Sequence, residues 1–189
     1  MSKDEKKKFL KNVTVLVDTR EKENKHILSA FDEYGISYQS EKLDFGDYSF
    51  IVDGRDFRLS CVCERKAKPD EFYGNINFQS KRERIEKEFN AASRLANKFT
   101  LLLENCPSER ELKEVKLTDK DIYSQPNRKV LNIGKPCYET IRSWRCRYKF
   151  DVIYIADKAN TAAEMLEVFY WYYHNYKKLT RPLRKYNAN

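Results

Sequence analysis

Three short apolar runs set the strongest limit on how this chain can fold. They are VTVLVD at 13–18, FTLLL at 99–103 and DVIYIA at 151–156. Runs of this length, rich in aliphatic and β-branched residues, predict strands that are buried on both faces. Because patterns typical of helices separate them, we expect an α/β fold in which helices flank a central sheet.

Apolar residues recur at helical spacing in several of the intervening segments. The clearest case is 81–97, where Ile85, Phe89, Ala92 and Ala96 form one stripe. The same reasoning predicts helices at 24–34, 71–76, 138–147 and 161–176.

A β-hairpin is predicted between the first two of these helices. Residues 48–52 and 57–66 have β-forming composition, and Asp53-Gly54 between them is a turn signal. An antiparallel hairpin at this point would make the central sheet mixed. The polar stretch 106–136 is expected to be irregular, with a turn at Gln125.

The length of 189 residues indicates one domain with short tails. We assign 13–176 to the domain, 1–12 to a basic, flexible N-terminal arm and 177–189 to a basic C-terminal tail. No apolar run approaches the roughly 20 residues that span a bilayer, and the charged start lacks the apolar core of a secretory signal. We therefore expect an intracellular protein without a membrane anchor, cytoplasmic in a prokaryote or phage and nuclear in a eukaryote.

Composition narrows the chemistry that this chain can perform. Lys and Arg number 37 against 29 Asp and Glu, which gives a net charge of +8 and attracts polyanions such as nucleic acid. The five cysteines form no C-x-x-C pair, which argues against a zinc site or a disulfide framework. Only two histidines are present, far apart, so a histidine-based triad is not expected. Catalysis would have to rest on carboxylates and lysine.

Two carboxylates and one lysine are predicted to converge at the end of the hairpin. Glu64 and Lys66 are two residues apart on a strand, so their side chains share a face, and Arg65 points the other way. Asp47 lies roughly opposite Glu64 if the turn falls near residue 55. A Glu-Arg-Lys triplet also occurs by chance on solvated surfaces, but here it follows the apolar lead-in Cys61-Val62-Cys63.

This trio suits the hydrolysis of phosphodiesters. Mg²⁺ prefers oxygen ligands, typically one or two carboxylates completed by water and phosphate. The metal polarises the phosphate and activates a water, and a neighbouring lysine stabilises the developing charge. Asp18, at the end of the first predicted strand, is a candidate for a further metal ligand.

The same residues carry a family resemblance. The sequence resembles the XPF-type structure-specific endonuclease domain of the PD-(D/E)XK nuclease superfamily, whose pattern is G-D, a variable gap, E-R-K, three residues and D. The matching positions are Gly46-Asp47, Glu64-Arg65-Lys66 and Asp70. Val17-Asp18-Thr19-Arg20-Glu21 resembles the family's opening V-D-x-R-E, and Arg84-Ile85 its later R-L, although the glutamine expected four residues after that arginine is Glu88.

The resemblance implies a restriction-endonuclease-like fold and a role for each matching residue. Asp47 and Glu64 would be metal ligands with Asp18 as a third acid, and Lys66 would be the catalytic lysine. Arg65 and Asp70 would belong to the catalytic motif, although the strand geometry favours a structural ion pair for Arg65, for example with Asp70, at least equally. Phosphate contacts are expected from Arg20, Arg82 and Arg84.

The sequence therefore predicts a DNA endonuclease that depends on Mg²⁺, with Mn²⁺ as a substitute, and that cuts flap, fork or branched DNA in repair or recombination. A catalytically inactive DNA-binding scaffold with the same fold is the alternative, and a restriction-like or junction-cutting enzyme would change the substrate alone. The tandem helix-hairpin-helix modules usual in the family are not found in these 189 residues, so a separate DNA-targeting protein is an expected partner. The aromatic stripe of 161–176 suggests a homodimer. Further candidate phosphate contacts, for which solvated surface is an equal explanation, are Lys7, Lys8, Lys11, Lys81, Arg142, Arg145 and Arg147.

Overall fold

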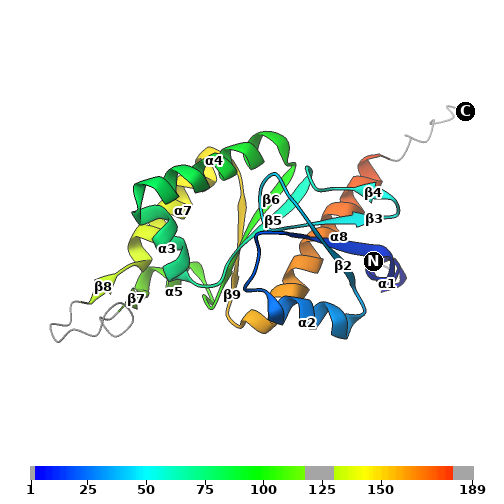
Figure 1. The fold of residues 1–189 in the computed structure, drawn as a ribbon, viewed down its shortest axis with the longest axis horizontal. Helices are drawn as coiled ribbons and strands as arrows, with labels where there is room; N and C mark the ends of the chain where they lie inside the picture. The colour runs from blue at the N-terminus through cyan, green and yellow to red at the C-terminus, as the bar shows by residue number, and fades with distance from the viewer. Residues whose placement is uncertain (1–2, 118–129, 181–189) are drawn as a thin grey trace, which may run out of the picture.

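A computed structural model describes residues 3–117 and 130–180, and in this part of the chain helices flank a seven-stranded sheet (Figure 1). The predicted α/β fold with a mixed central sheet is confirmed. The turn expected at Gln125 lies outside the described residues. None of the described helices is both long enough and apolar enough to cross a membrane.

The sheet combines parallel and antiparallel pairs in the order β2-β1-β3-β5-β6-β9, with the short β4 paired to β3. β1 runs parallel to β2 and antiparallel to β3, which is antiparallel to β5. β5, β6 and β9 are parallel to one another. The strands are β1 Val13–Asp18, β2 Ser37–Glu41, β3 Tyr48–Val52, β4 Arg55–Asp56, β5 Cys61–Lys66, β6 Lys98–Glu104 and β9 Asp151–Ile155.

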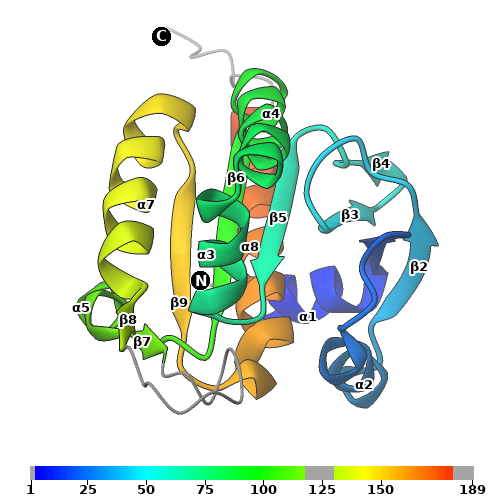
Figure 2. The same ribbon diagram turned by 60° about the vertical axis from the view of Figure 1, so that its left-hand side comes forward.

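Two groups of helices cover the two faces of this sheet, as Figure 2 shows. The first group consists of α3 Pro69–Asn77, α4 Gln79–Leu95 and α7 Gly134–Tyr148, with the short α5 Glu109–Glu114 against α7. The second consists of α1 Lys3–Asn12, α2 Lys25–Tyr34 and α8 Thr161–Leu179, which the 3-10 turn η1 Lys158–Asn160 precedes. A separate small sheet pairs β7 Lys116–Leu117 with β8 Leu131–Asn132.

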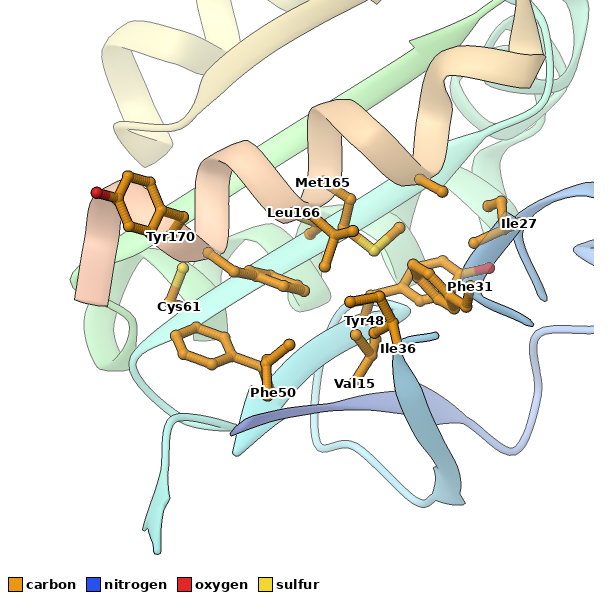
Figure 3. Close-up of a cluster of buried hydrophobic side chains, with 14 of the residues drawn as sticks. Val15, Ile27, Phe31, Ile36, Tyr48, Phe50, Cys61, Met165, Leu166 and Tyr170 are labelled. Carbon is orange, nitrogen blue, oxygen red and sulfur yellow. The ribbon is translucent and has the colours of Figure 1, made fainter. Parts of the chain in front are cut away.

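Each face of the sheet carries its own hydrophobic core, and strand alternation assigns side chains to one or the other. In β5, Cys61 and Cys63 belong to the core under α2 and α8, part of which Figure 3 shows. Val62 belongs to the core under α3, α4 and α7. Glu64 and Lys66 therefore lie on the α4 side of the sheet, and Arg65 lies on the α8 side.

The hairpin forms as predicted at its turn but not along its whole length. Asp53 and Gly54 both have positive φ, and Val52 pairs with Arg55. Continuing that register would place Leu59 opposite Tyr48, whereas Cys63 occupies this place, so the chain leaves the ladder after Phe57 and rejoins it with the register shifted by four residues. The predicted continuous strand 57–66 is therefore wrong in its first part, although Asp47 still lies beside Glu64.

The N-terminal segment is a helix, so the prediction of a flexible arm is wrong for residues 3–12. The ring of Phe9 packs against those of Phe50, Tyr170 and Tyr173, and the side chain is buried. Lys6 forms an ion pair with Glu167 of α8. Leu10 packs against the same core beside Phe9, so two adjacent apolar residues among lysines dock this helix.

Two further boundaries differ from the sequence prediction. The segment 106–136 was expected to be irregular, but it contains α5, whose first turn is capped by the Ser108 hydroxyl, and the start of α7. Gly134 allows α7 to approach α5, because a Cβ there would lie 1.9 Å from the carbonyl oxygen of Leu112. At the other end, α8 continues to Leu179 and so takes in the first residues assigned to the C-terminal tail.

Candidate active site

The predicted catalytic residues lie around one cavity of about 270 Å³. The cavity is bounded by the segment after β1, the segment before β3, the end of β5 and the middle turns of α4. Its lining residues are Arg20, Gly46, Asp47, Glu64, Lys66, Arg84 and Glu88. The structure thus brings Asp47, Glu64 and Lys66 together with two of the three arginines expected to contact phosphate.

Lys66 and Glu64 form a buried ion pair on the α4 side of β5. Nζ of Lys66 lies 2.6 Å from Oε1 of Glu64 and 3.7 Å from Oε1 of the more exposed Glu71. Burial alone would lower the pKa of Lys66, but the carboxylates of Glu64, Asp47 and Glu71 outweigh it and raise that pKa above its usual range. Lys66 is therefore cationic across the range in which proteins function.

Asp47 is fixed by three hydrogen bonds between strands. Its backbone N–H donates to the Cys63 carbonyl at 2.9 Å, and its own carbonyl accepts from the backbone N–H of Asp18 at 2.8 Å. Its Oδ2 accepts from the backbone N–H of Arg65 at 2.8 Å. Burial and the nearby charge of Glu64 raise the pKa of Asp47 well above its ordinary value. Two carboxylates that repel one another in a buried place favour the arrival of a cation.

Gly46 is required for the close approach of this segment to β5. Its φ is +72°, and a Cβ at this position would lie 2.2 Å from Cγ1 of Val62 and 3.1 Å from the carbonyl oxygen of Cys63. No side chain fits there. The glycine before Asp47 therefore has a steric reason, because it lets the backbone carry the carboxylate into the cavity.

Asp18 holds Arg20 and does not line the cavity. Its Oδ1 accepts from Nε of Arg20 at 2.7 Å, and its Oδ2 accepts from Nη2 of Arg20 at 3.1 Å and from the backbone N–H of Leu43 at 2.7 Å. Burial raises the pKa of Asp18, but these hydrogen bonds outweigh it and lower that pKa. Both oxygens are occupied, so the structure does not offer Asp18 as the third metal ligand expected from the sequence.

Arg65 lies on the α8 side of the sheet and ties three segments together. Its Nη1 donates to Oε2 of Glu104 at 2.9 Å, and its Nη2 donates to Oε1 of Glu21 at 2.9 Å. Glu104 also accepts from the hydroxyl of Thr161 at 2.6 Å and lies 2.8 Å from Nε2 of His26. The predicted structural ion pair of Arg65 is present, but its partners are Glu104 and Glu21.

Asp70 and Arg82 lie outside the cavity. Asp70 is in the first turn of α3, and its carboxylate pairs with Lys68 at 2.8 Å, so the suggested pairing of Asp70 with Arg65 is wrong. Arg82 pairs with Glu86 one turn along α4 at 3.1 Å and lies over the ring of Trp144. Sequence spacing placed these two residues near the motif, but the helix directions carry their side chains elsewhere.

Glu88 is the cavity residue that sequence reasoning did not assign to the site. It lies four residues after Arg84 on α4, and its Oε1 is 3.8 Å from Nη1 of Arg20. Burial and the charge of Glu64 raise its pKa, while Lys66, Arg20 and Arg84 oppose this. The signal available was its helical spacing from Arg84, which predicts the same face.

The donor set fits a magnesium ion held by few protein ligands. Within residues 3–117 and 130–180, no group of three or more acidic, histidine or cysteine side chains is arranged to hold a metal ion. Asp47 and Glu64 remain as two carboxylates beside one cavity. Mg²⁺ is commonly bound by one or two carboxylates and keeps several waters, which agrees with this set.

A larger, apolar cavity of about 670 Å³ lies along α8, in a part of the fold distinct from these residues. Trp171, Tyr172, Tyr176 and Leu179 are among its lining residues. The aromatic stripe noted in the sequence is thus divided, because Met165, Phe169 and Tyr173 are buried in the core while Tyr172 and Tyr176 line this cavity.

Known proteins resemble this chain both in sequence and in fold. Residues 17–169 match the family model of the ERCC4 domain. The fold is similar to XPF from Aeropyrum pernix, with a TM-score of 0.58 and 17% identity over 88% of this chain and 68% of that one. It is equally similar to the same protein in complex with DNA, with a TM-score of 0.58 and 17% identity over 86% of this chain and 66% of that one.

These likenesses bear on the fold and on family membership. The chain spans about two thirds of the length of the two Aeropyrum pernix structures. No significant match was found among curated proteins. The predicted nuclease-type fold is confirmed by the structural similarity, and the matched residues include every residue of the cavity.

Proposed function

The chain belongs to the ERCC4 domain family, that of the XPF-type nucleases, and from this premise we propose that it is a metal-dependent DNA endonuclease. The observation that carries the proposal is the meeting of Asp47, Glu64 and Lys66 beside one cavity. Two carboxylates and an ammonium in this arrangement are the groups that phosphodiester hydrolysis requires.

The cavity offers separate groups for the cation and for the phosphate. Asp47 and Glu64 would hold Mg²⁺ or Mn²⁺, which when bound supplies positive charge to the scissile phosphate and an activated water. Arg20 and Arg84 line the same cavity, and their guanidinium groups would bind phosphate oxygens. Arg20 is suited to this role because Asp18 fixes one edge of its guanidinium.

Lys66 is the group that meets charge developing on the phosphate. Its ammonium is held by Glu64 and remains protonated, so it can donate hydrogen bonds to the attacking water or to a phosphate oxygen. Water attacks phosphorus, the P–O bond to the leaving nucleotide breaks, and the leaving oxygen takes up a proton. The burial of Glu64 and Lys66 strengthens these interactions relative to bulk water.

The proposal is tested by cleavage of labelled duplex, single-stranded, flap and splayed-arm DNA with Mg²⁺, with Mn²⁺ and with chelator. Glu64→Gln and Lys66→Ala should each lower the cleavage rate by at least about a hundredfold, the usual loss when a group stabilising the transition state is removed. Glu83→Gln is the matched control, because Glu83 is an exposed residue of α4 outside the cavity.

Three outcomes separate the readings. Metal-dependent cleavage that both variants abolish and the control retains supports the endonuclease. DNA binding without cleavage on any substrate supports the inactive scaffold. Cleavage that persists undiminished in Glu64→Gln and Lys66→Ala contradicts the assigned site. The same substrate panel identifies the preferred DNA structure.

Partners and pathway belong to the proposal as well. DNA is the expected ligand, and one of the two similar structures is a complex of Aeropyrum pernix XPF with DNA. A homodimer, a separate DNA-targeting protein, and a place in repair or recombination are further parts of it. A monomeric mass in light scattering at micromolar protein would remove the homodimer.

A further inference from the structure

Glu88 is a third acidic residue beside the proposed site, in addition to the two proposed metal ligands. It lines the same cavity as Asp47 and Glu64 but approaches it from α4. The family resemblance places a neutral glutamine at this point of the helix, so this chain adds a negative charge there. The side chain of Glu88 is 28% exposed, which leaves its charge only partly screened by solvent.

The nearest cation to Glu88 is one of the groups placed to bind phosphate. Nε and Nη2 of Arg20 are taken by Asp18, and Nη2 also donates to the Leu43 carbonyl at 3.1 Å. The remaining terminal nitrogen, Nη1, is the one that lies 3.8 Å from Oε1 of Glu88. A phosphate oxygen that approached Arg20 from the cavity would meet this same nitrogen.

The charges of the cavity balance when Glu88 is included. Three lining residues are basic and three are acidic, so their formal charges sum to zero. Asp47 and Glu64 are assigned to the cation, which leaves Glu88 as the acid that faces Lys66, Arg20 and Arg84 without a metal to bind. Without Glu88 the formal charges of the lining residues would sum to one net positive charge.

We infer that Glu88 pairs with Arg20 in the place of a DNA phosphate. An entering DNA backbone has to displace the Glu88 carboxylate. This inference rests on the proposed function, because it assumes that the cavity binds a phosphodiester. Glu88 thereby lowers the affinity of the cavity for DNA phosphate in general. DNA that also makes contacts outside the cavity then gains an advantage over DNA that offers a phosphate alone.

The test measures DNA binding by fluorescence anisotropy, with fluorescein-labelled splayed-arm DNA at low salt in the presence of EDTA, so that neither metal nor cleavage enters. Glu88→Gln should bind about two- to fivefold more tightly than wild type, the range of a partly exposed ion pair. Glu83→Gln is the matched control, since it removes the same charge from an exposed position of α4 outside the cavity. Its affinity should change by less than about twofold.

A second experiment tests whether the gain in DNA affinity depends on Arg20. In an Arg20→Gln background, Glu88→Gln should no longer tighten binding, because the group that Glu88 occupies is gone. Arg20→Lys provides the same test if Arg20→Gln does not fold, since one ammonium cannot pair with Asp18 and meet Glu88 as the guanidinium does. Thermal unfolding of each variant establishes that it is folded.

The outcomes distinguish this inference from the proposed function. An equal gain in Glu88→Gln and Glu83→Gln, no gain in Glu88→Gln, or a gain that persists without Arg20 would each overturn the inference while wild type still binds DNA. If wild type binds no DNA, the proposed function and the inference fail together.

Discussion

The backbone N–H of Arg65 donates to Oδ2 of Asp47 at 2.8 Å on one side of the sheet, while the guanidinium of the same residue is held on the other side. Arg65 is therefore not a group that meets substrate. It connects the buried cluster of Glu104 and Glu21 to the backbone that orients Asp47, and its neighbours Glu64 and Lys66 share that backbone.

Loss of the Glu104 carboxylate should lower the stability of the folded protein. Glu104→Ala removes one anionic partner of the buried Arg65 and the acceptor of Thr161, so we expect the free energy of unfolding to fall by about 3 kcal/mol. Chemical denaturation measures this loss. Asp151→Ala is the control, because the ion pair of Asp151 with Lys98 is exposed, and its loss should cost less than about 1 kcal/mol. Equal losses in the two variants would contradict the role given to Glu104.

Gly46 should tolerate no side chain. In Gly46→Ala the new Cβ clashes with Cγ1 of Val62. The segment before β3 must then move away from β5, which displaces Asp47. We expect an unfolding free energy lower by more than about 2 kcal/mol and a loss of cleavage. Gly54→Ala is the matched control, because Gly54 has φ +73° but open space around it, and should cost about 1 kcal/mol.

The same clash offers a rescue. Val62→Ala removes the atom nearest to the new Cβ, so the double variant Gly46→Ala, Val62→Ala should recover part of the lost cleavage relative to Gly46→Ala alone. The recovery is expected to be partial because the Cys63 carbonyl also lies within 3.1 Å of the Cβ. Two losses that simply add would show that close approach to β5 is not what the glycine provides.

Stability should depend on pH through Asp18. Burial raises the pKa of this carboxyl, but hydrogen bonds from Arg20 and Leu43 outweigh burial, and the folded-state pKa lies below its ordinary value of 3.8. A lowered carboxyl pKa contributes stability that is present above the unfolded value and is lost as pH falls through the folded one. Asp18→Asn should therefore lower the melting temperature near neutral pH and show a smaller further decline below about pH 4 than wild type does. If the melting temperatures of wild type and Asp18→Asn fell by equal amounts as the pH was lowered, this account would be contradicted.

Strand alternation was the rule that let the sequence predict most of the site. It placed Glu64 and Lys66 on one face and Arg65 on the other, and both placements agree with the two cores around β5. The pairing of Asp47 with Glu64 was predicted from a hairpin centred near residue 55. The structure reaches the same pairing through a turn at Asp53-Gly54 and a register shift of four residues between β4 and β5.

Other features depend on contacts that sequence spacing does not contain. Asp18 ends a strand on the α4 side of the sheet, but whether it meets a metal or an arginine depends on the path of the chain after β1. Glu88 lines the cavity because the fold brings α4 beside Asp47 and Glu64. The docking of α1 depends on Phe9 finding three aromatic rings that are distant in sequence.

The central claim is that Asp47 and Glu64 share one divalent cation beside Lys66, and a crystal structure of the protein soaked in Mn²⁺ tests it most directly. An anomalous difference map should show a peak within about 2.5 Å of a carboxylate oxygen from each of these two residues, with Nζ of Lys66 on the same side of the sheet. A fully occupied Mn²⁺ site elsewhere in the molecule, with no anomalous density between Asp47 and Glu64, would contradict the account.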